Sequence, residues 1–278
     1  MWEREDEIIM TNDLGIIINP IGVVRSETKN PEDIPLPGQP ARVEIFPQYS
    51  DALLRIEGNS HLWLLLWFHR SDRSCLRTIP RRMSSNLPEY GVFGLRSPNL
   101  PNPIALCLVH LDALEDNILQ VHGLDAIDGT PVLDIKSYYE QDIIFSPTTP
   151  YIRASDPILR RNIFMKQALS HHQEECPDLF LAIRMALVAD EYMGHLNRPD
   201  LKLTVKGSAC LADTLQGLSR ARLANPPRFA FQETTALPSI VWVDNNHQLK
   251  IDARCNLNQV TFTELTDEEL FRIDFREL

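Results

Sequence analysis

The chain has 278 residues, and its 27 Lys and Arg against 38 Asp and Glu give a formal net charge of −11. Such an acidic chain has no overall field to attract a polyanion, so any contact with nucleic acid requires a local basic patch. The length predicts two domains. With 44% apolar and 23% charged residues, the composition is that of a folded globular protein and excludes a disordered one.

The amino terminus and the cysteines favour a cytoplasmic protein. Residues 1–14 form an acidic tail where a secretory signal would be basic. The longest apolar run, Leu62–Phe68, is too short to span a bilayer as a helix and is typical of a buried strand, so we expect no membrane contact. Five scattered cysteines without a Cys-x-x-Cys pair indicate neither a disulfide framework nor a zinc ribbon.

The first half of the chain is a series of short apolar runs separated by turn residues. It holds 14 of the 20 prolines and 8 of the 11 glycines within residues 1–150. This pattern predicts an all-β barrel or sandwich. The runs are Ile16–Val24, Ala41–Phe46, Leu62–Phe68, Ile104–Leu111, Ile118–Gly123 and Val132–Tyr138.

The pattern changes after the turn-rich segment Ser146–Pro150. Apolar residues at three- and four-residue spacing predict helices over Asp156–His172 and Pro177–Met193. Later segments predict strands at Leu201–Val205, Arg228–Phe231, Ser239–Val243 and Leu249–Ala253, and a helix at Cys210–Leu223. The fold class is therefore a two-domain α+β chain. We expect a tail at 1–14, a β domain at 15–147, a linker at 148–155 and a mixed α+β domain at 156–278.

The stretch Tyr90–Ala105 concentrates residues that resist regular structure around one cation, Arg96. Its three prolines fix φ and cannot donate to a β ladder, so the segment forms a rigid, shaped loop. Rigid loops of this kind commonly carry binding groups, although a wide hairpin with a solvated arginine would have the same composition.

Two further segments place polar groups at strand ends. Asp128-Gly129 is a strong turn signal, which puts Asp125 at the end of one strand and Asp134 inside the next. A carboxylate at a strand end, such as Asp125, can accept hydrogen bonds from a ribose or an amine. His61 and His69 bracket the apolar run at Leu62–Phe68, so both lie where the β domain opens.

Together these segments closely resemble the TsaA-like (TrmO) family of S-adenosylmethionine-dependent tRNA methyltransferases. The family's motifs are an S-H-[LI]-W strand ending in F-H, a G-V-F-A-T-R-S-P-x-R-P-N-P-I-G loop, and G-L-D-x-x-D-G-T-P-V-L-D-I-K-P-Y. Here they stand at Ser60–His69, Gly91–Ala105 and Gly123–Tyr138, and an opening I-G-x-[IV]-R-S strand stands at Ile21–Ser26. The resemblance covers about residues 15–145.

The resemblance implies a small β-barrel that forms a homodimer, binds S-adenosyl-L-methionine and methylates the exocyclic amine of threonylcarbamoyl-adenosine in tRNA. Arg96 can pair with a carboxylate, and Leu106 can cover the adenine. No residue is required as a general base, although Asp125 or His69 could assist. The implied cofactor contacts are His69, Arg70, Arg96, Leu106, Leu124 and Asp125, with Pro37, Gly38 and Gln39 in the place of the family's P-R-Q segment.

Two departures from the family pattern leave other functions open. Leu100 replaces the second arginine of the loop, and Leu36 or Pro37 replaces the arginine of P-R-Q. The loss of two cations is compatible with methylation of a small molecule. A non-catalytic S-adenosylmethionine sensor or a metal-handling accessory protein is a third possibility, favoured by the second domain.

A local group of arginines offers the best site for tRNA. Residues 1–150 carry 12 basic and 21 acidic residues, but the segment Arg70–Arg96 holds six arginines against Asp72 and Glu89. Arg77, Arg81 and Arg82 in this segment could bind phosphates, since arginine matches their geometry. A solvent-exposed face without a ligand would show the same pattern.

The second domain more weakly resembles the FmdE-like domain of formylmethanofuran dehydrogenase, over about residues 160–245. His172, Cys176 and Cys210 stand in metal-ligand-like positions, and sulfur with imidazole suits zinc. The family's second histidine falls on Glu174, and the glycine after its Cys-Pro falls on Asp178. The sequence therefore favours a structural α+β module over a bound metal.

Overall fold

The computed structural model describes residues 17–35, 37–255 and 261–278, and it divides the chain into two compact units. The first unit contains the residues up to Leu76 and Val92–Tyr138, and the second contains Arg77–Gly91 and Tyr139–Leu278. The acidic tail at 1–14 and Leu36 lie outside the described residues. The two units are therefore interleaved in sequence, because 15 residues between two barrel strands belong to the second unit.

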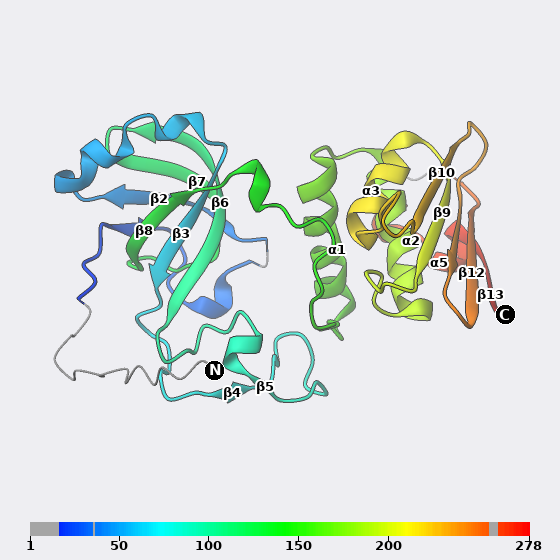
Figure 1. Ribbon diagram of the computed structural model, residues 1–278, viewed down its shortest axis with the longest axis horizontal. Coiled ribbons are helices and arrows are strands. Elements are labelled where there is room, and N and C mark those ends of the chain that lie inside the picture. Colours follow the sequence, from blue (N-terminus) through cyan, green and yellow to red (C-terminus); the bar gives the residue numbers. More distant parts are fainter. Residues whose placement is uncertain (1–16, 36, 256–260) are drawn as a thin grey trace, which may run out of the picture. The chain divides into compact units, whose positions relative to one another are not determined.

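The first unit is a closed barrel of six strands in the order β1-β2-β7-β6-β3-β8, in which every neighbouring pair is antiparallel (Figure 1). This arrangement confirms the predicted all-β barrel. The strands are β1 (Gly22–Arg25), β2 (Gln39–Ile45), β3 (His61–Trp67), β6 (Ile104–Glu115), β7 (Ile118–Leu124) and β8 (Pro131–Ser137). Short 3₁₀ helices lie in the connections: Pro31–Asp33, Pro47–Leu53, Ile56–Gly58, Val92–Gly94 and, after the barrel, Glu140–Asp142.

Strand β3 is buried on one face only, which corrects the prediction of a fully buried strand. Leu62, Leu64 and Leu66 point into the barrel and have no exposed surface, whereas the residues between them are partly exposed. Successive side chains of a strand point to opposite faces, and a barrel has only one interior. An unbroken apolar run therefore leaves apolar side chains on the outer face.

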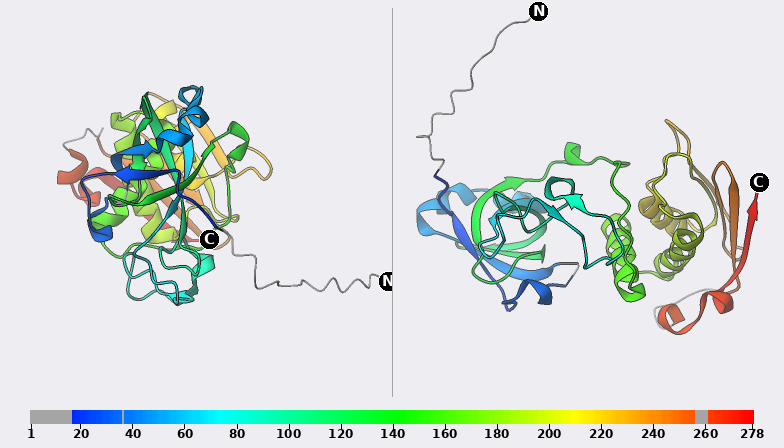
Figure 2. Two further views of the ribbon diagram at one scale, coloured as in Figure 1. Left: turned by 90° about the vertical axis from the view of Figure 1, so that its left-hand side faces the viewer. Right: turned by 90° about the horizontal axis from the view of Figure 1, so that it is seen from below.

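The second unit is a five-stranded sheet with helices on it. The strand order is β10-β9-β11-β12-β13, and only the β9–β10 pair is parallel. Helices α2 and α3 pack on the sheet, and α1 packs on both of them (Figure 2). The strands are β9 (Lys202–Gly207), β10 (Phe229–Glu233), β11 (Ser239–Val243), β12 (His247–Ala253) and β13 (Phe271–Glu277), and a ribbon of β4 (Arg77–Thr78) and β5 (Tyr90–Gly91) belongs to the same unit.

The helices begin where the sequence supplies a cap. Asp156 accepts a hydrogen bond from the Leu159 amide at the start of α1 (Pro157–His172), and Pro177 opens α2 (Pro177–Met193). Helix α3 (Ala209–Ser219) ends four residues before the predicted end, because Arg220 takes a left-handed conformation with φ of 53°. Two short helices, α4 (Thr261–Glu264) and α5 (Asp267–Leu270), precede β13. None of the described helices is both long and apolar enough to cross a membrane.

The alternation in β3 gives a direct test of the barrel. Leu64→Ala removes a side chain with no exposed surface, and we expect it to lower the free energy of unfolding by about 2–5 kcal/mol. Leu65→Ala, one residue along and on the outer face, is the matched control and should cost clearly less. Chemical denaturation of both variants measures the difference. Equal losses would contradict the assignment of the two faces.

Candidate cofactor site

Three connections of the barrel lie at the same rim. Because neighbouring strands are antiparallel, the links from β1 to β2, from β3 to β6 and from β7 to β8 all leave and re-enter at one end. The predicted cofactor residues lie in these links or at the adjoining strand ends, and Leu106 lies two residues into β6. The topology thus gathers residues that are up to 88 positions apart in the sequence.

Two glycines bring the β1–β2 connection into direct contact with the end of β7, where the β7–β8 connection begins. Gly38 and Gly123 have φ values of 83° and 84°, in the left-handed region that favours glycine. A Cβ on Gly38 would overlap the backbone of Gly123. The loop that contains Pro37 and Gly38 therefore lies directly against the end of β7, next to Leu124 and Asp125.

The Gln39 side chain joins the same two links. Its Oε1 accepts a hydrogen bond from Thr28 Oγ1 at 2.5 Å, and its Nε2 donates to the Ala126 carbonyl at 2.7 Å. The side chain is 7% exposed. A buried amide with both ends bonded is costly to remove, so Gln39 positions the rim.

Arg70 connects the link after β3 to this network. Its guanidinium donates to the Lys29 carbonyl at 3.0 Å, one residue after Thr28. Lys29 Nζ in turn lies 2.5 Å from Asp128 Oδ2, and Asp128 Oδ1 accepts from the Ser26 amide at 3.1 Å. The hydrogen bond from Lys29 and the one from the Ser26 amide lower the pKa of Asp128. Asp128 thus fixes the turn, as the Asp-Gly signal predicts.

Asp125 is an exposed acid at the end of β7 on this rim. Its carboxylate has no ion-pair partner among the described residues, while its carbonyl accepts from the Cys107 thiol at 3.8 Å. The neighbouring Leu124 has no exposed surface, in its side chain or in its backbone. Leu106, adjacent to Cys107, is 50% exposed and can cover an apolar ligand surface. Sequence reasoning missed Cys107 and Thr28, because their roles depend on which strands pair.

His69 and Arg96 are exposed, and no described hydrogen bond or ion pair joins either of them to the Gln39 network. The loop after Arg96 is anchored to the link after β3, since Asn99 Oδ1 accepts from the Asp72 amide at 3.0 Å. Asp134, in contrast, pairs with Lys136 at 2.6 Å. His61 lies at the other end of β3, away from this rim, where its ring contacts His110 with centroids 5.1 Å apart.

A groove of about 540 Å³ opens where β3 ends and where β6 and β8 begin. Trp67, Ile104 and Leu133 form apolar parts of its wall. Arg73 lies over the Trp67 ring at 5.6 Å and donates to the Pro101 carbonyl at 2.9 Å. This volume is within the range of small-molecule sites.

The six arginines of the basic segment Arg70–Arg96 are divided between the two units, and the three predicted to bind RNA all belong to the second. Arg70, Arg73 and Arg96 belong to the barrel, while Arg77, Arg81 and Arg82 belong to the second unit. All of them are exposed, and Arg77 pairs with Glu89 at 3.6 Å. The single basic segment of the sequence is therefore not a continuous part of one domain.

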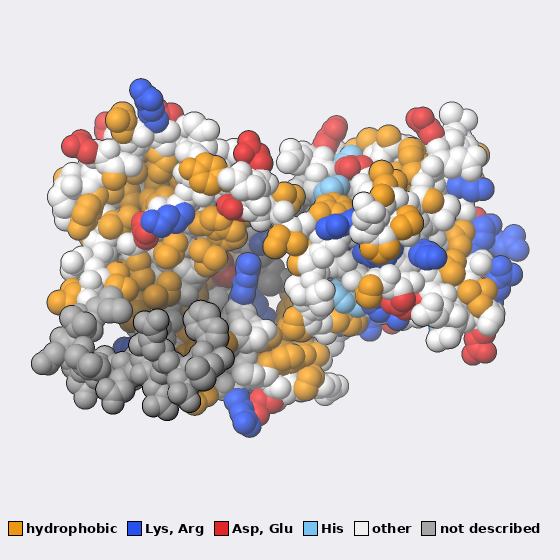
Figure 3. All heavy atoms as spheres, in the orientation of Figure 1, with side chains coloured by type: hydrophobic (Ala, Val, Ile, Leu, Met, Phe, Trp, Pro, Cys, Tyr) orange, Lys and Arg blue, Asp and Glu red, His pale blue; other side chains and the backbone are white. Residues whose placement is uncertain are grey.

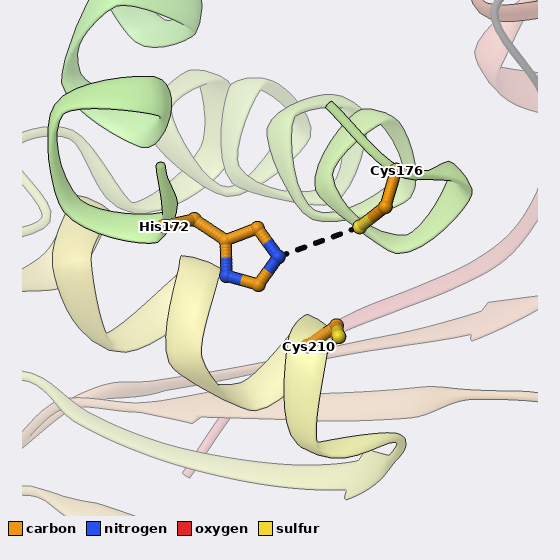
Figure 4. A group of neighbouring side chains, drawn as sticks. All are labelled: His172, Cys176 and Cys210. Carbon is orange, nitrogen blue, oxygen red and sulfur yellow. Dashed lines mark hydrogen bonds between the residues drawn. The ribbon is translucent and has the colours of Figure 1, made fainter. Parts of the chain in front are cut away.

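The remaining predicted residues, His172, Cys176 and Cys210, meet within the second unit. Their ligand atoms lie within 4.8 Å of one another (Figure 4). Sequence spacing alone could not show this, because Cys210 is 34 residues from Cys176.

Comparison with known proteins identifies the family. The model of the tRNA-methyltransferase O N-terminal domain matches residues 23–142. A "Probable S-adenosyl-L-methionine-binding protein" of Methanothermobacter thermautotrophicus is 46% identical over 134 residues, which are 46% of this chain and 94% of that protein. The chain belongs to the TsaA-like (TrmO) family of S-adenosylmethionine-dependent methyltransferases. The predicted resemblance of the first half is thereby confirmed.

Two further relatives extend the comparison. A "Probable S-adenosyl-L-methionine-binding protein" of Archaeoglobus fulgidus is 34% identical over 216 residues, covering 74% of this chain and 58% of its own length. A match of that extent must include part of the second unit. A mouse "tRNA (adenine(37)-N6)-methyltransferase" is 35% identical over 134 residues, covering 44% of this chain and 31% of the mouse protein.

The role of Gln39 in this TrmO-family rim can be measured. Gln39→Ala leaves Thr28 and the Ala126 carbonyl without their partner, and we expect it to lower the free energy of unfolding by about 1–3 kcal/mol. Gln48→Ala is the control, because Gln48 is exposed on a 3₁₀ helix. Thermal and urea denaturation report the effect. A loss no greater than that of the control would show that the amide does not hold the links together.

Proposed function

We propose that this chain transfers the methyl group of S-adenosyl-L-methionine to the exocyclic amine of threonylcarbamoyl-adenosine in tRNA. The observation that carries the proposal is the rim at which the family's motif residues converge through Gly38, Gln39 and Arg70. The names of the relatives, one of them a tRNA adenine N6-methyltransferase, support the donor and the acceptor.

Each rim residue contacts a different chemical group of the cofactor. Asp125 supplies a carboxylate that accepts from the ribose hydroxyls or from an amine, and Arg96 supplies a cation for the methionine carboxylate. The exposed side chain of Leu106 covers the adenine. His69 lies at the end of β3 on the same rim.

The reaction is a direct in-line transfer. The amine nitrogen attacks the methyl carbon, the bond from carbon to the sulfonium sulfur breaks with its electron pair, and the amine proton leaves after attack. The protein contributes mainly by orienting donor and acceptor. Asp125 or His69 can take up the proton, since both are exposed at the rim.

Asp125→Asn tests the cofactor assignment. Loss of the rim carboxylate should raise the Kd for S-adenosylmethionine at least tenfold, or about 1.4 kcal/mol, by calorimetry. Asp134→Asn is the matched control, because Asp134 pairs with Lys136 inside β8 and should leave the Kd unchanged. Equal Kd values for both variants would remove Asp125 from the site.

The tRNA acceptor is tested with tritiated S-adenosylmethionine and total tRNA. The double variant Arg81→Glu and Arg82→Glu should raise the KM for tRNA about tenfold or more, because two phosphate contacts become repulsive, while the Kd for S-adenosylmethionine stays the same. Arg42→Glu with Arg55→Glu makes the same change of charge at two exposed barrel positions and is the control. No methyl transfer to tRNA by the parent protein, with cofactor binding retained, would overturn the tRNA proposal.

A small-molecule acceptor is the second candidate. It is favoured by the leucine at position 100, where the family has an arginine, and by the excess of acidic residues in the first 150 residues. Methylation of a metabolite extract by a protein that binds S-adenosylmethionine but does not label tRNA would support it. Cofactor binding without any transfer would instead support a sensor.

We further propose that the barrel pairs with a second copy through the outer face of β3 and β6. Cross-strand pairs place Trp63 beside Leu108 and Trp67 beside Ile104 on this face. Figure 3 displays hydrophobic side chains on the face of the first unit along which these strands run. Contiguous exposed apolar surface of this kind is typical of an interface.

A charge in the middle of this face should separate the copies. Leu108 is 38% exposed, and Leu108→Lys should convert a dimer into a monomer in sedimentation equilibrium. Leu54→Lys is the control, because Leu54 is an exposed leucine directly after the 3₁₀ helix Pro47–Leu53, which follows β2. A parent protein that sediments as a monomer would contradict the dimer.

A further inference from the structure

Three potential metal ligands converge from three different helix ends in the second unit. His172 is the last residue of α1, Cys176 is the N-cap of α2, and Cys210 is the second residue of α3. The distance from His172 Nε2 to Cys176 Sγ is 3.4 Å, and all three ligand atoms lie within 4.8 Å of one another (Figure 4). Three separate segments therefore place imidazole and sulfur around one point.

The surrounding contacts hold the helix ends in place. Ser208, the N-cap of α3, donates to Asp178 Oδ2 at 2.6 Å and so ties the start of α3 to the start of α2. The link from α1 to α2 is four residues long and begins at Gln173, whose φ is 61°. These constraints fix the backbone at the three ligand residues and do not depend on a bound ion.

Asp213 sets the orientation of the histidine. Its Oδ2 lies 2.7 Å from His172 Nδ1, and its Oδ1 lies 3.2 Å from His171 Nε2. A carboxylate that accepts from Nδ1 leaves the Nε2 lone pair free, and Nε2 is the atom that faces Cys176. Metal-bound histidines almost always have such a carboxylate or carbonyl partner on the other ring nitrogen.

The cysteine at the start of α2 is unusual for a structural cap. Its sulfur accepts from the Leu179 amide at 3.4 Å, although sulfur is a weak acceptor and Ser, Thr, Asp and Asn are the preferred caps. The other two long helices of the unit start with Asp156 and Ser208. Sulfur at this position is instead a strong ligand for a soft metal.

We propose that His172, Cys176 and Cys210 bind a zinc ion, with one coordination position left for water or another exchangeable ligand. Tetrahedral zinc with bonds of about 2.3 Å to sulfur and 2.0–2.1 Å to nitrogen separates these ligand atoms by about 3.6 Å, close to the distance between His172 Nε2 and Cys176 Sγ. Two thiolates and one imidazole prefer zinc over magnesium or calcium. The His172 side chain is 9% exposed, so the site is largely shielded.

A second group of potential metal ligands in the described residues, His110, Asp112 and His122, differs from the first in its ligand types and its exposure. His110 and His122 both direct Nδ1 at the same oxygen of Asp112, at 2.9 and 2.7 Å, and all three side chains are more exposed. This group contains no sulfur, and its histidine atoms are already bonded to the carboxylate. It therefore serves as the internal reference for the zinc site.

The metal content of the purified protein tests the proposal. The full-length chain, purified without a tag under reducing conditions, should contain about one equivalent of zinc. Replacement of that zinc by cobalt should give a thiolate-to-cobalt charge-transfer band and the visible bands of a tetrahedral site. The variants Cys176→Ser and Cys210→Ser each lack one sulfur ligand. Each should therefore lose the part of the charge-transfer intensity that this sulfur contributes. Asp213→Asn should weaken zinc binding about 10–100-fold.

The controls separate ligand loss from misfolding. Cys255→Ser changes a cysteine of the same unit outside the cluster and should keep the full metal content. His122→Asn removes a ligand of the reference group and should leave the cobalt spectrum unchanged. The circular dichroism of each cysteine variant shows whether the helices persist. No zinc in the parent protein, or cobalt bands that survive in both Cys176→Ser and Cys210→Ser, would overturn the proposal.

Discussion

Antiparallel closure of the six-stranded barrel is the constraint on which the candidate cofactor site depends. In a closed antiparallel barrel, every connection between strands lies at one of the two rims. The connections β1–β2, β3–β6 and β7–β8 lie at the same rim. The motif segments of the TsaA-like family are thereby gathered at one rim, although the three segments are far apart in sequence. The barrel interior is lined mainly by aliphatic side chains, and Cys107 among them also donates to the Asp125 carbonyl at the rim.

The rim is held by backbone groups more than by charges. Gly38 lies against Gly123, the Gln39 amide spans two links, and Arg70 donates to a carbonyl. This use of backbone acceptors leaves the Asp125 carboxylate and the Arg96 guanidinium available for a ligand.

Helices and strands could be predicted from the sequence where the local signals are strong. Contacts between segments that are far apart in sequence could not. Helix α2 and strand β11 have the predicted bounds, since a proline after a cap and a run of β-branched residues mark their ends. Strand β13 was missed although Phe271, Ile273 and Phe275 alternate with charged residues. The contacts of Gln39 and of Asp213 were beyond sequence reasoning, because each joins segments whose pairing only the tertiary fold defines.

The interleaving of the two units divides the arginine-rich connection between β3 and β6. The chain leaves the barrel at Leu76 and returns at Val92, and in between Met83 accepts hydrogen bonds from the Ser155 amide and hydroxyl within the second unit. Arg81 and Arg82 are therefore held by the second unit, while Arg96, on the same connection, belongs to the barrel. One connection of the chain therefore carries arginines that belong to two separate compact units.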